Sequence, residues 1–140
     1  MALDRSAALP LLGGCHCGQV RYRATKAPVR TEICHCTDCR KATGGLFAAL
    51  VDFERAAVTI AGEVGIHASS PKVKRGFCPA CGTPLFYDHQ DETVICMTLG
   101  SLDAPDLVRP DGHCGTQSKL SWYVISDGLP QRKTGEPFEG

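Results

Sequence analysis

The cysteines are the residues of this sequence whose spacing suits metal chemistry. The chain holds nine of them in 140 residues, and seven occur in three short groups. These groups are Cys15 with Cys17, Cys34 with Cys36 and Cys39, and Cys78 with Cys81. An odd number of cysteines without a recognisable secretory signal argues against a disulfide framework, whereas closely spaced thiols suit one shared ion. The sequence therefore predicts metal binding.

The segment CPACG, at residues 78–82, has the form of a zinc knuckle. Two cysteines three positions apart, followed by Gly82, allow a tight turn to direct both sulfurs at one ion. The alternative is a thioredoxin-like redox pair, which needs a strand–helix–strand context that the neighbouring sequence lacks. We therefore interpret Cys78 and Cys81 as two ligands of a zinc ion.

A knuckle of two thiolates needs two more ligands from elsewhere in the chain. The candidates are the pair Cys15 and Cys17 and the pair Cys36 and Cys39. Spacing alone does not choose between them, but Gly14 and Gly18 bracket the first pair and permit a tight turn there. If the first pair completes the site, the group at 34–39 keeps three thiols. Three protein ligands with an exchangeable fourth position is the general form of a catalytic zinc site.

The composition describes an ordinary globular protein. Hydrophobic residues make up 43% and charged residues 21%, and the formal net charge is +0. This neutral balance, with only 6% aromatic residues, argues against nucleic acid as a partner. No apolar run approaches the roughly 20 residues that cross a bilayer, and the first residues do not resemble a signal peptide. We expect a cytoplasmic protein without a membrane or nucleic-acid partner.

Most segments between the cysteine groups favour β-structure. They are rich in β-branched or aromatic residues and are separated by turn residues. The expected strands are 19–25, 46–53, 58–61, 65–69, 85–87, 93–99 and 121–125. Helix signals are limited to one or two turns over 39–43, which Thr37 or Asp38 would cap and Gly44 would end. We expect a mainly β domain over 13–131, with a leader at 1–12 and a tail at 132–140.

Three motifs give the chain its resemblance to a known family. They are GGCHCGQVR at 13–21, CHCTDCRKATG at 34–44 and RGFCPACGT at 75–83. In this order they resemble the glutathione-dependent formaldehyde-activating enzyme family, which includes the centromere protein V type. Further matches are GSLDAP at 100–105, Ser118-Lys119 followed by Trp122, and DGLP at 127–130. The resemblance covers about 13–131.

The resemblance implies a fold, two zinc ions and an activity. The fold would be an Mss4-like β-sheet structure stapled by zinc. Cys15, Cys17, Cys78 and Cys81 would be ligands of a structural zinc. Cys34, Cys36 and Cys39 would hold a second, catalytic zinc with an open position. The family's activity is to condense formaldehyde with glutathione into S-hydroxymethylglutathione, a reaction classed with the carbon–sulfur lyases.

Other residues near the open site are candidates for substrate binding. Arg40 and Lys41 follow the third thiol and would offset its charge or bind a glutathione carboxylate; the alternative is two solvated charges. Gly44 would let backbone approach the substrate or simply end the helical turn. His113 would act as acid or base on the product oxygen, or be a hydrogen-bonded structural residue.

Two other residues are assigned to packing. Cys96, within 93–99, and Trp122 are expected in the core. Cys114 is where the chain departs from the family pattern, and we interpret it as an incidental thiol, the alternative being an extra thiol near the open site.

The sequence thus predicts a zinc-dependent enzyme that joins glutathione to formaldehyde or another small electrophile. Two other functions remain open. The first alternative is a non-catalytic carrier of glutathione or another thiol. The second is a zinc-ribbon interaction module in which both zinc ions would be structural. A redox or metal sensor that uses exposed thiolates ranks below both.

Overall fold

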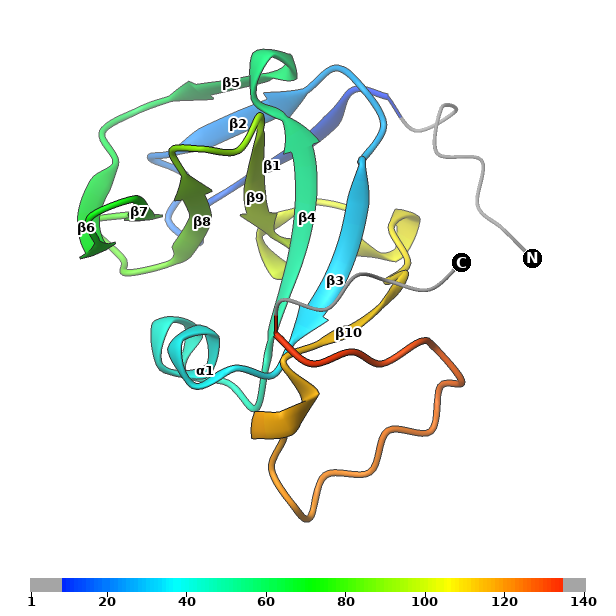
Figure 1. The fold of residues 1–140 in the computed structure, drawn as a ribbon. Coiled ribbons are helices and arrows are strands. Elements are labelled where there is room, and N and C mark those ends of the chain that lie inside the picture. Colours follow the sequence, from blue (N-terminus) through cyan, green and yellow to red (C-terminus); the bar gives the residue numbers. More distant parts are fainter. Residues whose placement is uncertain (1–8, 135–140) are drawn as a thin grey trace.

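Two β-sheets pack face to face in this computed structural model, which describes residues 9–134 (Figure 1). The smaller sheet has the strand order β1-β2-β5, and the larger has the order β10-β3-β4-β9-β8-β7-β6. The strands are β1 Leu11–Gly14, β2 Arg21–Ala24, β3 Arg30–Cys34, β4 Ala48–Glu54, β5 Val58–Ala61, β6 Gly65–Ser70, β7 Val73–Phe77, β8 Pro84–His89, β9 Val94–Thr98 and β10 Gly112–Cys114. The mainly β expectation is confirmed.

One α-helix, α1 at Thr37–Thr43, and four short 3₁₀ turns complete the described part of the chain. The 3₁₀ turns are Arg55–Ala57, Leu99–Ser101, Pro105–Leu107 and Thr116–Ser118. No helix among residues 9–134 has the length and apolarity that a membrane span requires.

The hydrophobic core lies between the two sheets. The small sheet contributes Leu11 and Tyr22, and the large sheet contributes Val51, Phe53 and Met97, all nearly or fully buried. Because strand side chains alternate between faces, the residues between these core positions point to the opposite face of the large sheet. That outer face carries the polar groups described below.

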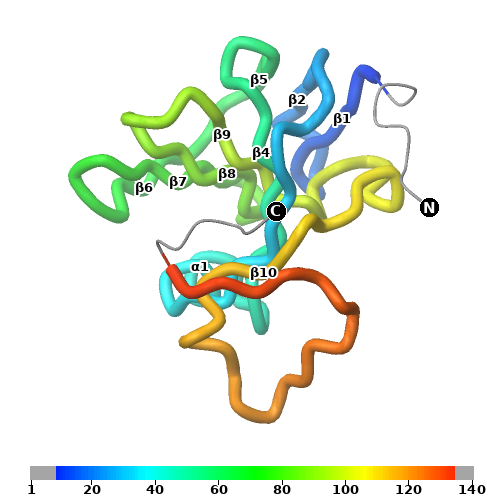
Figure 2. The backbone as a smooth tube through the Cα atoms, turned by 45° about the vertical axis from the view of Figure 1, so that its right-hand side comes forward, coloured from blue at the N-terminus to red at the C-terminus, as the bar shows by residue number. Residues whose placement is uncertain are grey.

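Several strands differ from expectation. Strands β3, β7 and β10 were not anticipated, because their short segments mix charged residues, glycine and cysteine with few apolar residues. The expected strand at 121–125 is wrong, since the chain there forms turns and irregular structure within the long loop below α1 (Figure 2). Trp122 lies on this loop with 67% of its surface exposed, so its expected place in the core is also wrong.

The ends of the expected domain extend further than 13–131. Strand β1 begins at Leu11, whose side chain is buried in the core. At the other end, Arg132 Nη2 donates to both carboxylate oxygens of Glu32 at 2.9 and 3.1 Å. The remaining parts of the expected leader and tail, 1–8 and 135–140, lie outside the described residues.

Gly76 of β7 provides a test of the packing between β7 and β8. It pairs with Phe86, and a Cβ atom at position 76 would lie 2.3 Å from the Phe86 ring. We expect Gly76→Ala to lower the free energy of unfolding by roughly 1–3 kcal/mol, because the ring has to move out of a packed position. Gly100→Ala is the matched control, since no atom lies within 4 Å of the methyl group that alanine would add there. Chemical denaturation of the zinc-loaded proteins measures both, and equal stabilities would contradict the packing.

Candidate functional site

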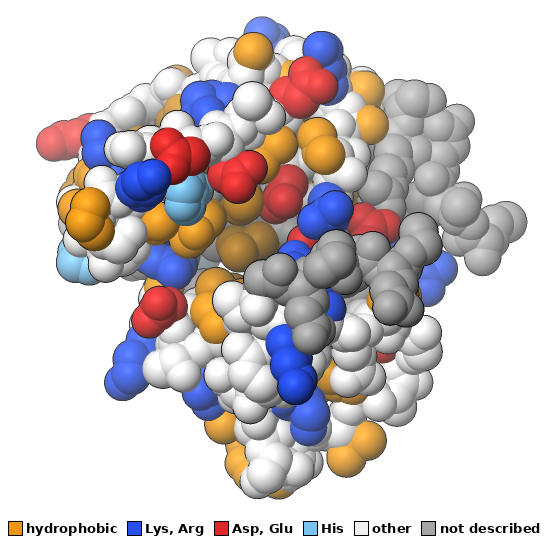
Figure 3. All heavy atoms as spheres, in the orientation of Figure 1, with side chains coloured by type: hydrophobic (Ala, Val, Ile, Leu, Met, Phe, Trp, Pro, Cys, Tyr) orange, Lys and Arg blue, Asp and Glu red, His pale blue; other side chains and the backbone are white. Residues whose placement is uncertain are grey.

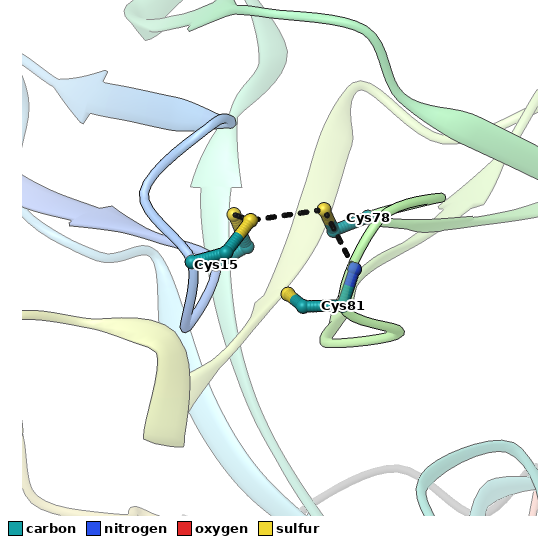
Figure 4. Close-up of side chains that lie close together, drawn as sticks. Cys15, Cys78 and Cys81 are labelled. Atoms are coloured by element: carbon teal, nitrogen blue, oxygen red, sulfur yellow. Dashed lines mark hydrogen bonds between the residues drawn. The ribbon is translucent and has the colours of Figure 1, made fainter.

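Four thiols meet where two turns face each other (Figure 4). Cys15 and Cys17 belong to the turn between β1 and β2, and Cys78 and Cys81 to the turn between β7 and β8. All four sulfur atoms lie within 4.8 Å of one another. The Cys17 Sγ atom is 3.5 Å from Cys15 Sγ and 3.7 Å from Cys78 Sγ. Of the two pairs left open by spacing, the structure places Cys15 and Cys17 beside the knuckle.

The two turns are built alike. Each has a glycine with positive φ directly after its last cysteine, Gly18 at 84° and Gly82 at 81°, a conformation that glycine adopts without strain. The Gly18 N–H donates to the Cys15 carbonyl, and the Gly82 N–H donates to the Cys78 carbonyl at 2.8 Å. These closed turns direct neighbouring thiols to the same side.

The donor set of this first cluster fits a structural zinc. Four sulfurs in a closed group match the tetrahedral four-cysteine arrangement of structural zinc sites. Backbone N–H groups support two of them, from Val20 to Cys15 Sγ at 3.2 Å and from Cys81 to Cys78 Sγ at 3.5 Å. The hydroxyl of Thr83 lies 3.2 Å from Cys81 Sγ, and this contact is the strongest of several hydrogen bonds that lower the pKa of Cys81 to about 5. An ion here would join the small sheet to the large one.

A second group of three thiols lies at the start of α1. Cys34 ends β3, Cys36 is the N-cap of α1, and Cys39 is in its first turn. Their sulfur atoms also lie within 4.8 Å of one another, with Cys34 Sγ 3.3 Å from Cys36 Sγ. The Cys39 N–H donates to Cys36 Sγ at 3.3 Å, so the helix N-terminus orients one of the thiols. The set fits a zinc with three protein ligands.

Cys114 lies beside this three-thiol group without belonging to it. It pairs with Cys34 across the parallel strands β10 and β3, so the two side chains lie next to each other at the cavity wall. This contact, followed by those from Cys36 and Cys39, lowers the pKa of Cys34. The structure thus gives Cys114 the alternative position, near the three thiols, in place of the incidental one that we favoured.

A cavity of about 360 Å³ borders the three thiols. Its wall also includes Cys114, Asp52, Cys96, Tyr87 and Arg75. A larger cavity of about 480 Å³ shares Arg75 and Tyr87 with it and extends towards Lys41. Figure 3 shows a hollow in the centre of this face, with hydrophobic side chains at its floor and charged side chains around it. We call the smaller space the thiol cavity.

Three of the predicted substrate residues lie mainly outside the thiol cavity. Arg40, Lys41 and Gly44 line a separate cavity of about 410 Å³ beside Leu120. The Arg40 guanidinium donates to Thr37 Oγ1 at 3.3 Å. Lys41 also reaches the larger cavity. Gly44 has φ of 75° and its N–H donates to the Arg40 carbonyl, which is how it ends the helix.

His113 also lies away from the thiol cavity. It is nearly fully buried, and its side chain points to the other face of β10 from that of Cys114. Its Nδ1 atom lies 2.9 Å from His35 Nε2, and its Nε2 atom lies 2.7 Å from an Asp127 carboxylate oxygen. Because burial lowers the pKa of His35, we assign the neutral form to that ring. This arrangement matches the structural alternative for His113 and connects the loop after β10 to the thiol segment.

The sequence did not reveal the charged residues of the thiol cavity. Asp52 lies between the buried residues Val51 and Phe53 in β4, and this alternation in the sequence could have predicted that its side chain points away from the core. Arg75 lies in β7, which was not anticipated. Glu32 is buried and binds Arg132, which comes from the expected tail. Their meeting depends on strand pairing between distant segments.

Comparison with known proteins points to one family. A family model described as glutathione-dependent formaldehyde-activating enzyme matches residues 10–118. An uncharacterized lyase of Schizosaccharomyces pombe is 32% identical over 75 residues, which cover 54% of this chain and 55% of that protein. The chain therefore spans little more than half of that relative.

A second curated protein and a solved structure are each matched over more of their own length. A Halomonas elongata protein, named provisionally as a glutathione-dependent formaldehyde-activating enzyme, is 28% identical over 127 residues, or 82% of this chain and 80% of that one. A crystal structure of a Rhodobacter sphaeroides protein has a TM-score of 0.57 and 18% identity, covering 71% of this chain and 96% of that one. The last comparison shows a shared fold.

The two thiol groups should respond differently to loss of a ligand. We expect Cys78→Ser to unfold the protein or lower its melting temperature by tens of degrees, because a structural zinc supplies much of the folding free energy of a small domain. Cys36→Ser should keep the fold and lose one zinc. Circular dichroism with elemental zinc analysis measures both outcomes. A folded Cys78→Ser protein that retains all its zinc would contradict this assignment.

The partly buried carboxyl of Asp52 predicts a pH-dependent stability difference. Burial raises its pKa from 3.8 to about 6, so folding is penalised as pH rises from about 4 through 6 and the penalty is complete above that range. We expect Asp52→Asn to be stabilising relative to wild type by roughly 1 kcal/mol more at pH 7.5 than at pH 5. Urea unfolding at the two pH values measures the difference, and because both proteins keep the thiols, zinc loss affects them equally. If the stability difference between Asp52→Asn and wild type is the same at both pH values, the pKa of Asp52 is not raised in the folded protein.

Proposed function

This chain belongs to the glutathione-dependent formaldehyde-activating enzyme family, as its motifs indicated, and from that premise we propose that it joins glutathione to formaldehyde at the thiol cavity. The product would be S-(hydroxymethyl)glutathione. The observation that carries the proposal is the unequal pair of clusters. One has four thiols and forms a closed group, and the other has three thiols at the wall of a cavity.

We assign zinc to both clusters, with Cys15, Cys17, Cys78 and Cys81 structural and Cys34, Cys36 and Cys39 catalytic. A zinc held by three thiolates supplies a position where a further thiol is deprotonated at neutral pH. A free thiol has a pKa near ~8.5 and is mostly protonated there. The fit rests on the type and grouping of the donors.

The reaction itself is a simple addition. The glutathione sulfur forms a bond to the formaldehyde carbon, the carbon–oxygen π pair moves to oxygen, and that oxygen takes up a proton. The role of Cys34, Cys36 and Cys39 is to fix the position of the glutathione sulfur at the cavity wall. Cys39 is buried from bulk solvent, but all three thiols line the thiol cavity. A ligand therefore reaches the three-thiol group from the cavity side.

Binding of an anionic thiol ligand to the three-thiol group requires nearby cations, because the group and its metal ion would already carry a net negative charge. Three thiolates around a divalent ion carry a net charge of −1, and a fourth thiolate raises it to −2. Arg75 and Arg132 both line the thiol cavity, although Arg132 is paired with Glu32. We assign to Arg75 the carboxylate-binding role first expected of Arg40 and Lys41, since Arg75 lines the same cavity as the thiols.

The activity is tested by exchange spectroscopy on formaldehyde and glutathione. We expect the zinc-loaded protein to accelerate formation and breakdown of S-(hydroxymethyl)glutathione, measured by nuclear magnetic resonance at equilibrium. Cys36→Ser should lower this acceleration at least 100-fold, because the sulfur loses its position and activation. Glutathione with formaldehyde alone is the control.

Each rival function predicts a different result. If glutathione binds the wild-type protein without acceleration, the protein is a thiol carrier. If glutathione does not bind and Cys114→Ser releases the second zinc, Cys114 is a fourth protein ligand and both sites are structural, as in an interaction module. Either result would contradict the proposed enzyme.

A further inference from the structure

Among residues 9–134, two charged side chains of the thiol cavity form no salt bridge. They are Asp52 and Arg75. Arg30 lies opposite Asp52 in the β3–β4 pairing, but its guanidinium binds Glu32 in the same cavity, as does that of Arg132. A third charged residue, Asp38, is exposed in the first turn of α1, so water solvates its carboxylate. Asp52 and Arg75 are each partly buried and cannot rely on water to the same extent.

The sheet holds these two charges in one row. Asp52 pairs with Cys96, Cys96 with Tyr87, and Tyr87 with Arg75, across β4, β9, β8 and β7. Directly paired residues share a face, so all four side chains border the thiol cavity. With strands ~4.8 Å apart, the backbones of Asp52 and Arg75 are separated by about 14 Å, and their side chains can approach more closely.

Neighbouring side chains position both charges before any ligand binds. The Arg75 guanidinium carbon lies 4.9 Å from the centre of the Tyr87 ring, a stacking contact that leaves the planar fork of N–H donors available for a carboxylate. Asp52 lies opposite Cys96 in the β4–β9 pairing, and both side chains line the thiol cavity. A partly buried carboxylate whose cationic neighbour, Arg30, is already bound to Glu32 is costly, and a cationic ligand group would relieve that cost.

The tripeptide of the proposed reaction carries groups that match this row. Glutathione has an α-ammonium at its glutamyl end, a carboxylate at its glycine end and a thiol between them. Three residues in extended form span on the order of 10 Å, a length that fits between two side chains whose backbones are about 14 Å apart. The three-thiol group borders the same cavity, so a ligand held at both ends would present its thiol to that wall.

We propose that Asp52 binds the α-ammonium of glutathione and Arg75 binds its glycine carboxylate, with the thiol directed to Cys34, Cys36 and Cys39. This inference rests on the proposed function and adds to it the groups by which the substrate is recognised. It makes the site selective for a zwitterionic thiol peptide over simple thiols. Asp52 and Arg75 are then specificity-determining residues.

The test uses two analogues that each remove one charge from glutathione. In glutaryl-cysteinylglycine a hydrogen replaces the ammonium, and in the glycinamide form of glutathione an amide replaces the glycine carboxylate. Isothermal titration of the zinc-loaded wild type should show each analogue binding roughly tenfold or more weakly than glutathione, since each loses one charge-assisted contact. This comparison requires no variant to fold.

Variants then assign each charge to its residue. Asp52→Asn should weaken glutathione roughly tenfold and leave the affinity for the analogue without the ammonium unchanged. Arg75→Gln should weaken glutathione similarly and leave the affinity for the glycinamide unchanged. The matched controls are Asp103→Asn and Arg21→Gln, which remove the charges of an exposed ion pair outside the lining of the cavity and should have no effect.

The outcomes separate this inference from the proposed function. If wild type accelerates the exchange reaction but binds both analogues as tightly as glutathione, the two-ended binding mode is wrong and the activity stands. The binding mode is equally wrong if each variant weakens glutathione and its matching analogue to the same extent. If glutathione neither binds nor reacts, the proposed function fails and this inference fails with it.

Discussion

The cluster of four thiols at Cys15, Cys17, Cys78 and Cys81 is the constraint on which the rest of the structure depends. It lies where the turn between β1 and β2 meets the turn between β7 and β8, and a zinc ion held there would connect the small sheet to the large one. The core between the sheets is modest, and its aromatic residues are few. A domain of this size gains much from a metal that holds distant segments together. With the sheets fixed, the outer face of the large sheet can carry polar groups that contribute little to stability.

The second thiol group uses that outer face. Cys34 comes from the end of β3, and α1 supplies Cys36 and Cys39 through its N-terminus, so strand and helix must keep their relative position for the three sulfurs to meet. The hydrogen bonds that His113 makes with His35 and Asp127 support the same segment on the face opposite the thiol cavity. In this account the structural cluster and the buried histidines provide rigidity, and the cavity provides access.

The sequence predicted the parts of the site that depend on local spacing. Cysteines three or fewer positions apart, with a glycine after them, indicate turns that bring thiols together, and Gly44 indicated the end of the helix. It did not predict which charges would face the thiols, because pairing between distant strands decides this. Arg75 and Asp52 share one row of the sheet because of three strand pairings, and Cys114 lies beside Cys34 although 80 positions separate them in the sequence. The sequence also could not tell whether His113 or Cys114 faces the three thiols. Neighbouring residues in a strand point to opposite faces, and only the strand register decides which face each one takes.

Cobalt substitution tests the central claim, that one site is closed by protein thiols and the other is open, most directly. Sulfur-to-cobalt charge-transfer absorption of the Co²⁺-loaded protein reports how many thiolates bind each ion. The account predicts four thiolates at the first site and three at the second. Glutathione should add one at the second site, and Cys114→Ser should leave the spectrum unchanged. A second site that already has four thiolates without glutathione, and loses one in Cys114→Ser, would contradict the account.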